Sequence, residues 1–164
     1  MIRVLFVCLG NICRSPMAEA IFRHMLENEN LSPFIQVDSA GIGNWHTGKQ
    51  PHSGTRNILD REGISYRNSY ARQIEKDDWK NFDYIIVMDE QNIKDLEKIQ
   101  SKKGPVMGRL LEFVESSQVI NVPDPFFSGN FEYAYQLILS GCQHLLQFLK
   151  EYHQLNEEGE MNHG

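Results

Sequence analysis

The sequence predicts an α/β protein, in which one domain holds a doubly wound open sheet of four parallel strands with helices on both faces. Three observations predict this class. Short apolar runs alternate along the chain with longer segments of helical periodicity. The first and third runs are apolar nearly throughout, which is typical of parallel strands covered on both faces. The 164 residues contain no internal repeat and no low-complexity tract, so one domain accounts for the length.

The strands are predicted where β-branched and aromatic residues gather. Residues 3–8, RVLFVC, form the first and most apolar of these segments. Residues 34–39, FIQVDS, and residues 83–88, DYIIVM, have the same character. The fourth strand is assigned to residues 118–122, QVINV, on a weaker pattern.

Amphipathic patterns between these runs predict the helices. Apolar residues recur there at steps of three and four, which is the spacing of one helix face. The segments with this pattern are 16–30, 53–63, 90–100, 105–115 and 130–153. Because the pattern ends near residue 152, we expect residues 1–152 to form the domain and residues 153–164 to be a polar, disordered tail.

Composition limits the partners of this chain. A net charge of −6 leaves no basic stripe for nucleic acid. No apolar run has the length of a membrane span. The first strand begins almost at residue 1, so we expect no signal peptide. Three cysteines, two of them five positions apart, make no disulfide framework. We expect a cytoplasmic monomer that binds neither nucleic acid nor membranes.

The stretch VCLGNICRSP, residues 7–16, links the first strand to the first helix and contains no acid. In a doubly wound sheet, ligands bind beyond the carboxyl ends of the strands, where loops lead into helix N-termini. Ser15 as N-cap and Pro16 as first helical residue are expected to start the helix. Gly10 is expected to take a backbone angle that other residues resist, so that successive N–H groups turn inward toward an anion. The expected phosphate-binding residues of this loop are Leu9, Gly10, Asn11, Ile12, Cys13 and Ser15.

The Cys-x5-Arg spacing of Cys8 and Arg14 predicts phosphoryl-transfer chemistry. Arg14 would hold two oxygens of a phosphate-like group through its forked guanidinium. Cys8 would lie at the floor of the loop, where the same donors stabilise its thiolate as a nucleophile. Ser15 is placed to hydrogen-bond the sulfur when it leaves. A buried structural cysteine is the alternative, but it does not explain the arginine, serine and proline that follow.

An acid should face this nucleophile, because the leaving oxygen of a phosphate ester needs a proton. Asp124, between Pro123 and Pro125 after the predicted fourth strand, is the candidate. Loops that follow parallel strands share one edge of the sheet, so Asp124 can reach Cys8 despite their separation in sequence. A turn aspartate that bonds only its own backbone is the alternative.

The N-terminal motif and five further stretches resemble the low-molecular-weight protein tyrosine phosphatases. The resemblance covers residues 2 to about 150 and includes DSAG at 38–41, GNWHTG at 43–48, ARQ at 71–73 with FDYIIVMDEQN at 82–92, and VPDPFF at 122–127. It implies the family's Rossmann-like, phosphotyrosine protein phosphatase I-like fold. It also implies hydrolysis of phosphotyrosine in proteins, and of small aryl phosphate monoesters, with inorganic phosphate as a product and neither metal nor cofactor. Cys8 would carry a phosphocysteine intermediate, and Asp124 would act first as general acid and then as base.

The resemblance also implies roles for residues that support the loop. Asn11, Ser15 and Ser39 would hold it in shape by hydrogen bonds. The family often has a histidine just before ARQ, where this chain has Ser69. Cys13 resembles a thiol that forms a reversible disulfide with the nucleophile, although a small hydrophobe in the loop is the alternative.

Aromatic residues are expected to form the walls of the pocket. By the resemblance, Trp45, Phe126 and Phe127 would clasp a phenyl ring and select phosphotyrosine. The two phenylalanines stand where the family commonly has two tyrosines, so regulation by phosphorylation is not expected there. The six histidines show no metal-ligand spacing and are assigned no role.

Three other functions fit part of the pattern. An arsenate reductase on the same fold would need a further pair of cysteines near the third strand, and residues 83–100 contain none. A protein-arginine phosphatase tends to have threonine where this chain has Ile12, and the bulkier residue favours phosphotyrosine. A phosphate-binding or carrier module without turnover would have no use for Asp124.

Overall fold

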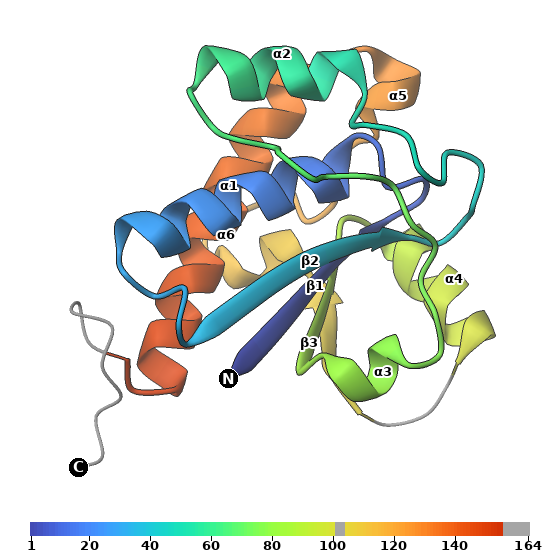
Figure 1. Cartoon of the computed structure of the whole chain (residues 1–164). Coiled ribbons are helices and arrows are strands. Elements are labelled where there is room, and N and C mark those ends of the chain that lie inside the picture. The colour runs from blue at the N-terminus through green and yellow to red at the C-terminus, as the bar shows by residue number, and fades with distance from the viewer. Residues whose placement is uncertain (101–103, 156–164) are drawn as a thin grey trace.

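The computed structural model describes residues 1–100 and 104–155 and contains one sheet of four parallel strands. The strands are β1 (Ile2–Cys8), β2 (Ile35–Gly41), β3 (Tyr84–Val87) and β4 (Val106–Arg109), in the order β2-β1-β3-β4 (Figure 1). The predicted fold class, four parallel strands between helices, is confirmed. The chain runs from β1 outward to β2 and returns to β3 on the other side of β1. The switch point of the sheet therefore lies between β1 and β3, and the loop after β1 opens there.

Helices cover both faces of the sheet. One face carries α1 (Arg14–Asn28) and α6 (Phe131–Tyr152), with α2 (Ser53–Arg61) packed against both helices. The other face carries α3 (Asp78–Asn81) and α4 (Glu90–Ile99), as Figure 1 shows.

Strand β1 is buried from both sides because successive side chains point to opposite faces. Val4, Phe6 and Cys8 belong to the larger core with α1 and α6. Leu5 and Val7 belong to the smaller core with α3 and α4. This explains the nearly uninterrupted apolar sequence of the first strand and fixes its last residue, Cys8, at the edge where the loops meet.

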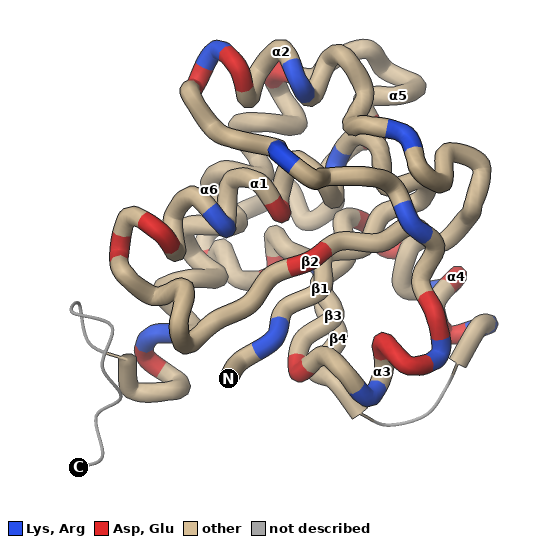
Figure 2. Tube along the Cα trace, in the orientation of Figure 1, with Lys and Arg blue, Asp and Glu red and all other residues tan. Residues whose placement is uncertain are grey.

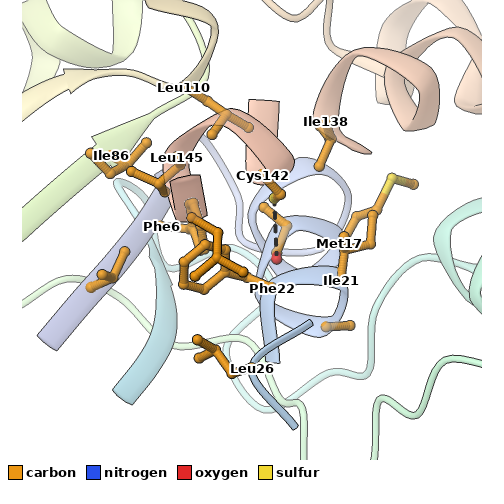
Figure 3. Close-up of a cluster of buried hydrophobic side chains, with 14 of the residues drawn as sticks. Phe6, Met17, Ile21, Phe22, Leu26, Ile86, Leu110, Ile138, Cys142 and Leu145 are labelled. Atoms are coloured by element: carbon orange, nitrogen blue, oxygen red, sulfur yellow. Dashed lines mark hydrogen bonds between the residues drawn. The ribbon is translucent and has the colours of Figure 1, made fainter. Parts of the chain in front are cut away.

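Aromatic and aliphatic side chains fill the larger core (Figure 3). The rings of Phe6 and Phe22 pack edge to face, with centroids 5.6 Å apart, an arrangement that contributes about 0.5–1.5 kcal/mol beyond the area it buries. Cys142 of α6 lies in this core, with its thiol directed at the carbonyl oxygen of Ala18 (3.8 Å). Burial raises the pKa of the Cys142 thiol, so it stays protonated and acts as a small core residue.

The fourth strand lies elsewhere than predicted. Residues 118–122 are an irregular segment in which Val119 and Ile120 are exposed and only Val122 is buried. The strand beside β3 is instead β4, within residues 105–115 that were predicted to be a helix. After β4 the chain makes only a short 3-10 turn, η1 (Leu110–Phe113). The helical spacing of apolar residues in 105–115 was misleading for two reasons. Leu110 and Leu111 are buried because they lie on the 3-10 turn, and β4 lacks a strongly apolar sequence because it is a short edge strand in which Val106 is 58% exposed.

Two short helices had no predicted counterpart, α3 and α5 (Pro125–Ser128). At the C-terminus, His153 and Leu155 lie within the described part, and Leu155 packs into the larger core. The remainder of the tail expected at 153–164 lies outside the described residues. In the part of the chain that the structure describes, no helix is both long and apolar enough to cross a membrane.

The outer edge of β2 is covered in two ways. Toward its end, Gly41 exchanges backbone hydrogen bonds with the segment at residues 72–74. Farther back, the carbonyl of Val37 accepts a hydrogen bond from Arg23 (3.1 Å), and the N–H of Ser39 donates to the carboxylate of Asp38 (2.8 Å). Lys and Arg are interspersed with Asp and Glu along the chain trace (Figure 2).

Gly141 allows α6 to pack closely against the 3-10 turn η1. A methyl group at this position would lie 2.5 Å from Cγ of Leu110, which is too close for any side chain. We expect Gly141→Ala to lower the free energy of unfolding by about 1–3 kcal/mol, because overpacking outweighs the better helix propensity of alanine. Urea unfolding measures the change, and Ser140→Ala on the same helix is the control. A more stable Gly141→Ala protein would contradict the close packing described here.

Candidate active site

The loop after β1 turns sharply at Asn11. Asn11 has φ of 57°, in the left-handed region that asparagine tolerates better than most residues. The expectation that Gly10 would take the unusual angle is wrong, since its φ lies outside that region. The position favours glycine for a different reason, which is lack of space. A Cβ atom at residue 10 would lie 3.1 Å from the ring of His46. His46 thus packs directly on the loop.

Helix α1 begins earlier than predicted. Its first helical residue is Arg14, and Cys13 is the N-cap, without a side-chain capping bond. Ser15 and Pro16 are therefore the second and third residues of the helix rather than its cap and first residue. Pro16 still fits, because N–H groups in the first turn have no partner within the helix. The Ser15 side chain turns inward instead of capping.

Cys8 lies under this turn, where two groups of Ser15 contact its sulfur. The Sγ atom of Cys8 and the Oγ atom of Ser15 are 3.0 Å apart, and the backbone N–H of Ser15 donates to Sγ at 3.4 Å. Both residues are buried. The first turn of α1 thus brings a hydroxyl group and a backbone N–H group to the sulfur.

The side chain of Asn11 holds the loop in shape. Its Nδ2 atom donates to Oγ of Ser15 (2.8 Å) and to Oγ of Ser39 (3.0 Å), and its Oδ1 atom accepts from the backbone N–H of Arg72 (3.0 Å). The structure thus brings Asn11, Ser15 and Ser39 together as one network. Ser69, which replaces the family's usual histidine, is buried, and within the described residues its side chain makes no hydrogen bond to this network.

Arg14 is 2% exposed and is held by groups from two other segments. Nη1 donates to Oδ2 of Asp89 (2.6 Å) and to the carbonyl oxygen of Val122 (2.9 Å), and Nη2 contacts Oδ2 of Asp124 at 3.3 Å. Burial opposes its charge, but Cys8, Asp124 and Asp89 outweigh burial and hold the pKa of the guanidinium above its ordinary value. Its Nε is buried with no partner among the described residues, so it is available to an oxygen of a bound anion.

Asp89 was not predicted as part of the site. Its Oδ1 atom accepts from the backbone N–H of Asn92, which caps α4, while its other oxygen holds Arg14. The cap fixes the carboxylate, and the carboxylate fixes the guanidinium. The local signal was the capping sequence after the third strand, which indicates a helix start and not an ion-pair partner.

Asp124 reaches the same pocket from α5. Its Oδ1 atom accepts from the N–H of Phe126 (3.0 Å), which caps this short helix, and Oδ2 faces Arg14. The two interpretations of Asp124 considered from sequence are therefore compatible, because one oxygen forms the turn and the other faces the site.

A pocket of about 280 Å³ opens above Cys8. Its floor includes the loop residues Leu9, Gly10, Ile12 and Cys13, and its sides are formed by Trp45, His46, Asp124, Phe126 and Phe127. Trp45 and Phe127 are 63% and 74% exposed, so the mouth of the pocket is a largely solvent-facing aromatic rim. Phe126 packs near His46 and edge-on to His52. Sequence reasoning assigned these histidines no role.

Residues 3–157 match the family model described as low molecular weight phosphotyrosine protein phosphatase. The chain belongs to this family. The resemblance predicted from the motifs is therefore confirmed.

Individual members of the phosphatase family are similar over nearly the whole chain. The low molecular weight protein-tyrosine-phosphatase YfkJ of Bacillus subtilis is 53% identical over 156 residues, which cover 94% of this chain and 100% of that protein. The crystal structure of YfkJ superposes with a TM-score of 0.91 at 52% identity, over 93% of this chain and 96% of that one. The structure of the Drosophila arginine phosphatase DARP has a TM-score of 0.83 at 36% identity, over 90% of this chain and 97% of that one.

Cys13 differs chemically from Cys8 although both line the pocket of this phosphatase. Burial, followed by the negative charges of Cys8 and Asp124, raises the pKa of the Cys13 thiol to about 12. Cys13 is therefore a neutral thiol near neutral pH. In the described part of the chain, no group of three or more His, Cys, Asp or Glu side chains could hold a metal ion. Independence from metal stays a prediction.

The three cysteines should react differently with iodoacetamide at about pH 7, because only a thiolate attacks it. We expect alkylation of Cys8, with Cys13 and Cys142 spared because their pKa values are raised. Peptide mass spectrometry measures each site, and denatured protein, in which all three should react, is the control. Inorganic phosphate should slow the reaction at Cys8. Labelling of Cys13 at a rate similar to Cys8 would contradict this account.

Proposed function

We propose that this family member is a cysteine-dependent protein-tyrosine phosphatase that works through a phosphocysteine on Cys8. The observation that supports this most strongly is the convergence of three groups on one pocket. Cys8 and Asp124 both line the pocket, and the buried guanidinium of Arg14 contacts Asp124 at 3.3 Å. A carrier of phosphate would need the first two groups and not the third.

In the first step the thiolate of Cys8 attacks phosphorus, and the bond between phosphorus and the tyrosine oxygen breaks. Asp124 gives its proton to the leaving oxygen. The N–H groups of the loop and Arg14 bind the three remaining oxygens, whose charge they stabilise in the transition state.

In the second step Asp124, now a carboxylate, takes a proton from a water molecule that attacks phosphorus. The bond between sulfur and phosphorus breaks, inorganic phosphate leaves, and the thiolate of Cys8 is restored. Ser15, whose Oγ is 3.0 Å from the sulfur, stabilises the thiolate as it leaves.

The pocket supports phosphotyrosine as the substrate group. Its walls are the aromatic rings of Trp45, Phe126 and Phe127, which can clasp a phenyl ring. A protein-arginine phosphatase is the second candidate, favoured by the likeness to the Drosophila arginine phosphatase. Ile12 of the pocket floor narrows the space and favours the flat phenyl ring. Cytoplasmic location, a monomeric state and lack of nucleic-acid binding stay predictions.

The catalytic proposal is tested by hydrolysis of an aryl phosphate in EDTA between about pH 5 and 8. We expect Cys8→Ser to abolish turnover and Asp124→Asn to lower it about 10²–10⁴-fold, because asparagine keeps the helix cap but has no proton to give. Asp77→Asn, at an exposed carboxylate, is the matched control and should behave as wild type.

Peptides carrying phosphotyrosine or phosphoarginine then separate the two substrate classes, and a preference for phosphoarginine would overturn our assignment. Wild-type protein that binds phosphate without turnover would support the carrier instead.

We propose further that Cys13 protects Cys8 from irreversible oxidation, as the family resemblance implied. Peroxide would oxidise the Cys8 thiolate to a sulfenic acid, with one peroxide oxygen leaving as water. The Cys13 sulfur would then attack the Cys8 sulfur, form a disulfide and release a second water. Part of the raised pKa of Cys13 comes from the charge of Cys8. Oxidation of Cys8 removes that charge, and Cys13 then loses its proton more readily.

After treatment with peroxide, we expect a Cys8–Cys13 disulfide by mass spectrometry and full recovery of activity with dithiothreitol. Cys13→Ser should instead accumulate sulfinic acid at Cys8 and recover little. Sulfinic acid at Cys8 in the wild type, without a disulfide, would rule out the protective role.

A further inference from the structure

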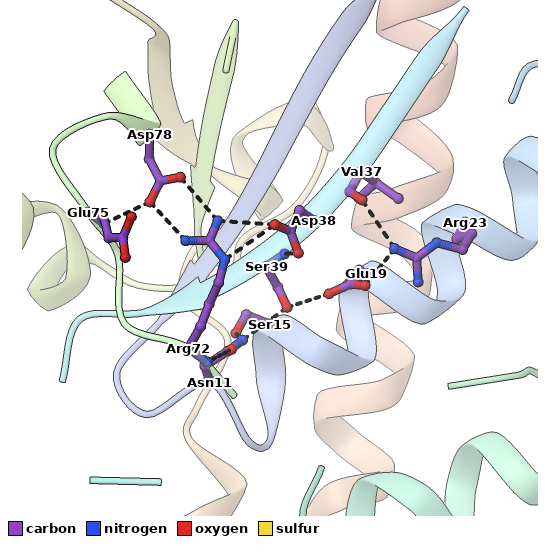
Figure 4. Close-up of polar contacts among 10 residues, drawn as sticks. All are labelled: Asn11, Ser15, Glu19, Arg23, Val37, Asp38, Ser39, Arg72, Glu75 and Asp78. Carbon is purple, nitrogen blue, oxygen red and sulfur yellow. Dashed lines mark hydrogen bonds and ion pairs between the residues drawn. The ribbon is translucent and has the colours of Figure 1, made fainter. Parts of the chain in front are cut away.

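A chain of hydrogen bonds runs from Cys8 to the exposed side of helix α1. Figure 4 shows the part of this chain from Ser15 to Arg23. Beyond Asn11 it continues through Ser39, whose Oγ donates to Oε1 of Glu19 at 2.5 Å. The other oxygen of Glu19, Oε2, accepts from Arg23 at 2.6 Å. Glu19 is only 6% exposed, whereas the side chain of Arg23 is 37% exposed. The Asp124 mechanism makes no use of this buried carboxylate.

The direction of each hydrogen bond in the chain can be assigned. Because Oδ1 of Asn11 accepts from the backbone N–H of Arg72, its amide orientation is fixed and Nδ2 must face the two serines. One hydrogen of Nδ2 goes to Ser15 and the other to Ser39. Each serine oxygen thus accepts from Asn11 and has its own hydrogen left to donate elsewhere.

The two ends of the chain take these remaining hydrogens. At one end the carboxylate of Glu19, which is an acceptor only, takes the hydrogen of Ser39. At the other end the hydrogen of Ser15 is left for the sulfur of Cys8. A neutral side chain at position 19 could donate a hydrogen bond to Oγ of Ser39. It would then compete with Nδ2 of Asn11 for the lone pairs of that oxygen and weaken the bond between Asn11 and Ser39.

We propose that Glu19, which is paired with Arg23, is a positioning residue that orients the hydroxyl of Ser15 toward the thiolate of Cys8. The proposal rests on the proposed phosphocysteine chemistry, to which it adds a charged group outside the substrate pocket. Arg23 contacts Glu19 from the solvent side of the chain of hydrogen bonds. It also borders a groove of about 860 Å³ beside β2, on a different surface from the pocket above Cys8.

The test compares Glu19→Gln, Arg23→Met and the control Glu27→Gln, an exposed glutamate on the same helix. The first readout is the pH dependence of Cys8 alkylation by iodoacetamide. We expect the midpoint to rise by about one pH unit in Glu19→Gln, a tenfold change in the ionisation equilibrium, because the thiolate loses a well-oriented donor. Arg23→Met should move it in the same direction by less, and Glu27→Gln should leave it unchanged.

The second readout is steady-state hydrolysis of an aryl phosphate. We expect kcat of Glu19→Gln to fall about tenfold while KM changes less than about twofold, because the thiolate is both attacking and leaving group. On a Ser39→Ala background, which already breaks the chain, Glu19→Gln should add little further loss.

A lower melting temperature with an unmoved alkylation midpoint would show that Glu19 has only a structural role. Should Glu19→Gln fail to fold, Arg23→Met and Ser39→Ala carry the same measurement, and an unmoved midpoint in both overturns the proposal. Alkylation needs no turnover, so it tests the positioning role even if the wild type proves not to be a phosphatase.

Discussion

The side-chain amide of Asn11 joins four parts of the chain. It bonds the hydroxyls of Ser15 on α1 and Ser39 on β2 and the backbone of Arg72, while its own backbone makes the left-handed turn of the loop. In the proposed mechanism, the loop that this amide holds presents its N–H groups to an anion before any anion binds. Preorganised donors of this kind need no rearrangement during the reaction, which is the main source of their effect on rate. Cys8 and Arg14 are held at the floor and side of a site whose shape depends on this one amide.

Much of the fold follows from local pattern, and the exceptions have a physical cause. The buried strands β1 and β3 are marked by nearly continuous apolar runs, and the helices α1 and α6 by apolar residues at steps of three and four. All four lie within about two residues of their predicted bounds. The fourth strand does not. Residues 105–115 contain apolar spacing typical of a helix, but pairing with the free edge of β3 makes β4 a strand, and that edge exists only after the sheet forms. Residues 118–122 have strand-like composition and no strand beside them to pair with.

Some residues of the candidate site could likewise be predicted from the sequence, and others could not. Cys8 and Arg14 could be found because their chemistry requires a fixed spacing within one loop. Asp124 was found through the family resemblance of residues 122–127, since the strand expected directly before it is an irregular segment. Asp89 and Glu19 could not be found, although both are charged and close to the motif in space. Their roles depend on which guanidinium or hydroxyl the tertiary structure brings to them. A carboxylate in a helical segment otherwise looks like any solvated surface residue.

The hydrogen bond from Arg23 to the carbonyl of Val37 has a consequence outside the chemistry of the site. Residues 35–39 of β2 lie at an open edge of the sheet, and unpaired backbone groups there could recruit a strand from a second molecule. Arg23 occupies the Val37 carbonyl, and Asp38 occupies the N–H of Ser39. The guanidinium that stabilises Glu19 therefore also shields the molecule from edge-to-edge aggregation. A substitution at position 23 would therefore free the Val37 carbonyl at the sheet edge as well as remove the partner of Glu19.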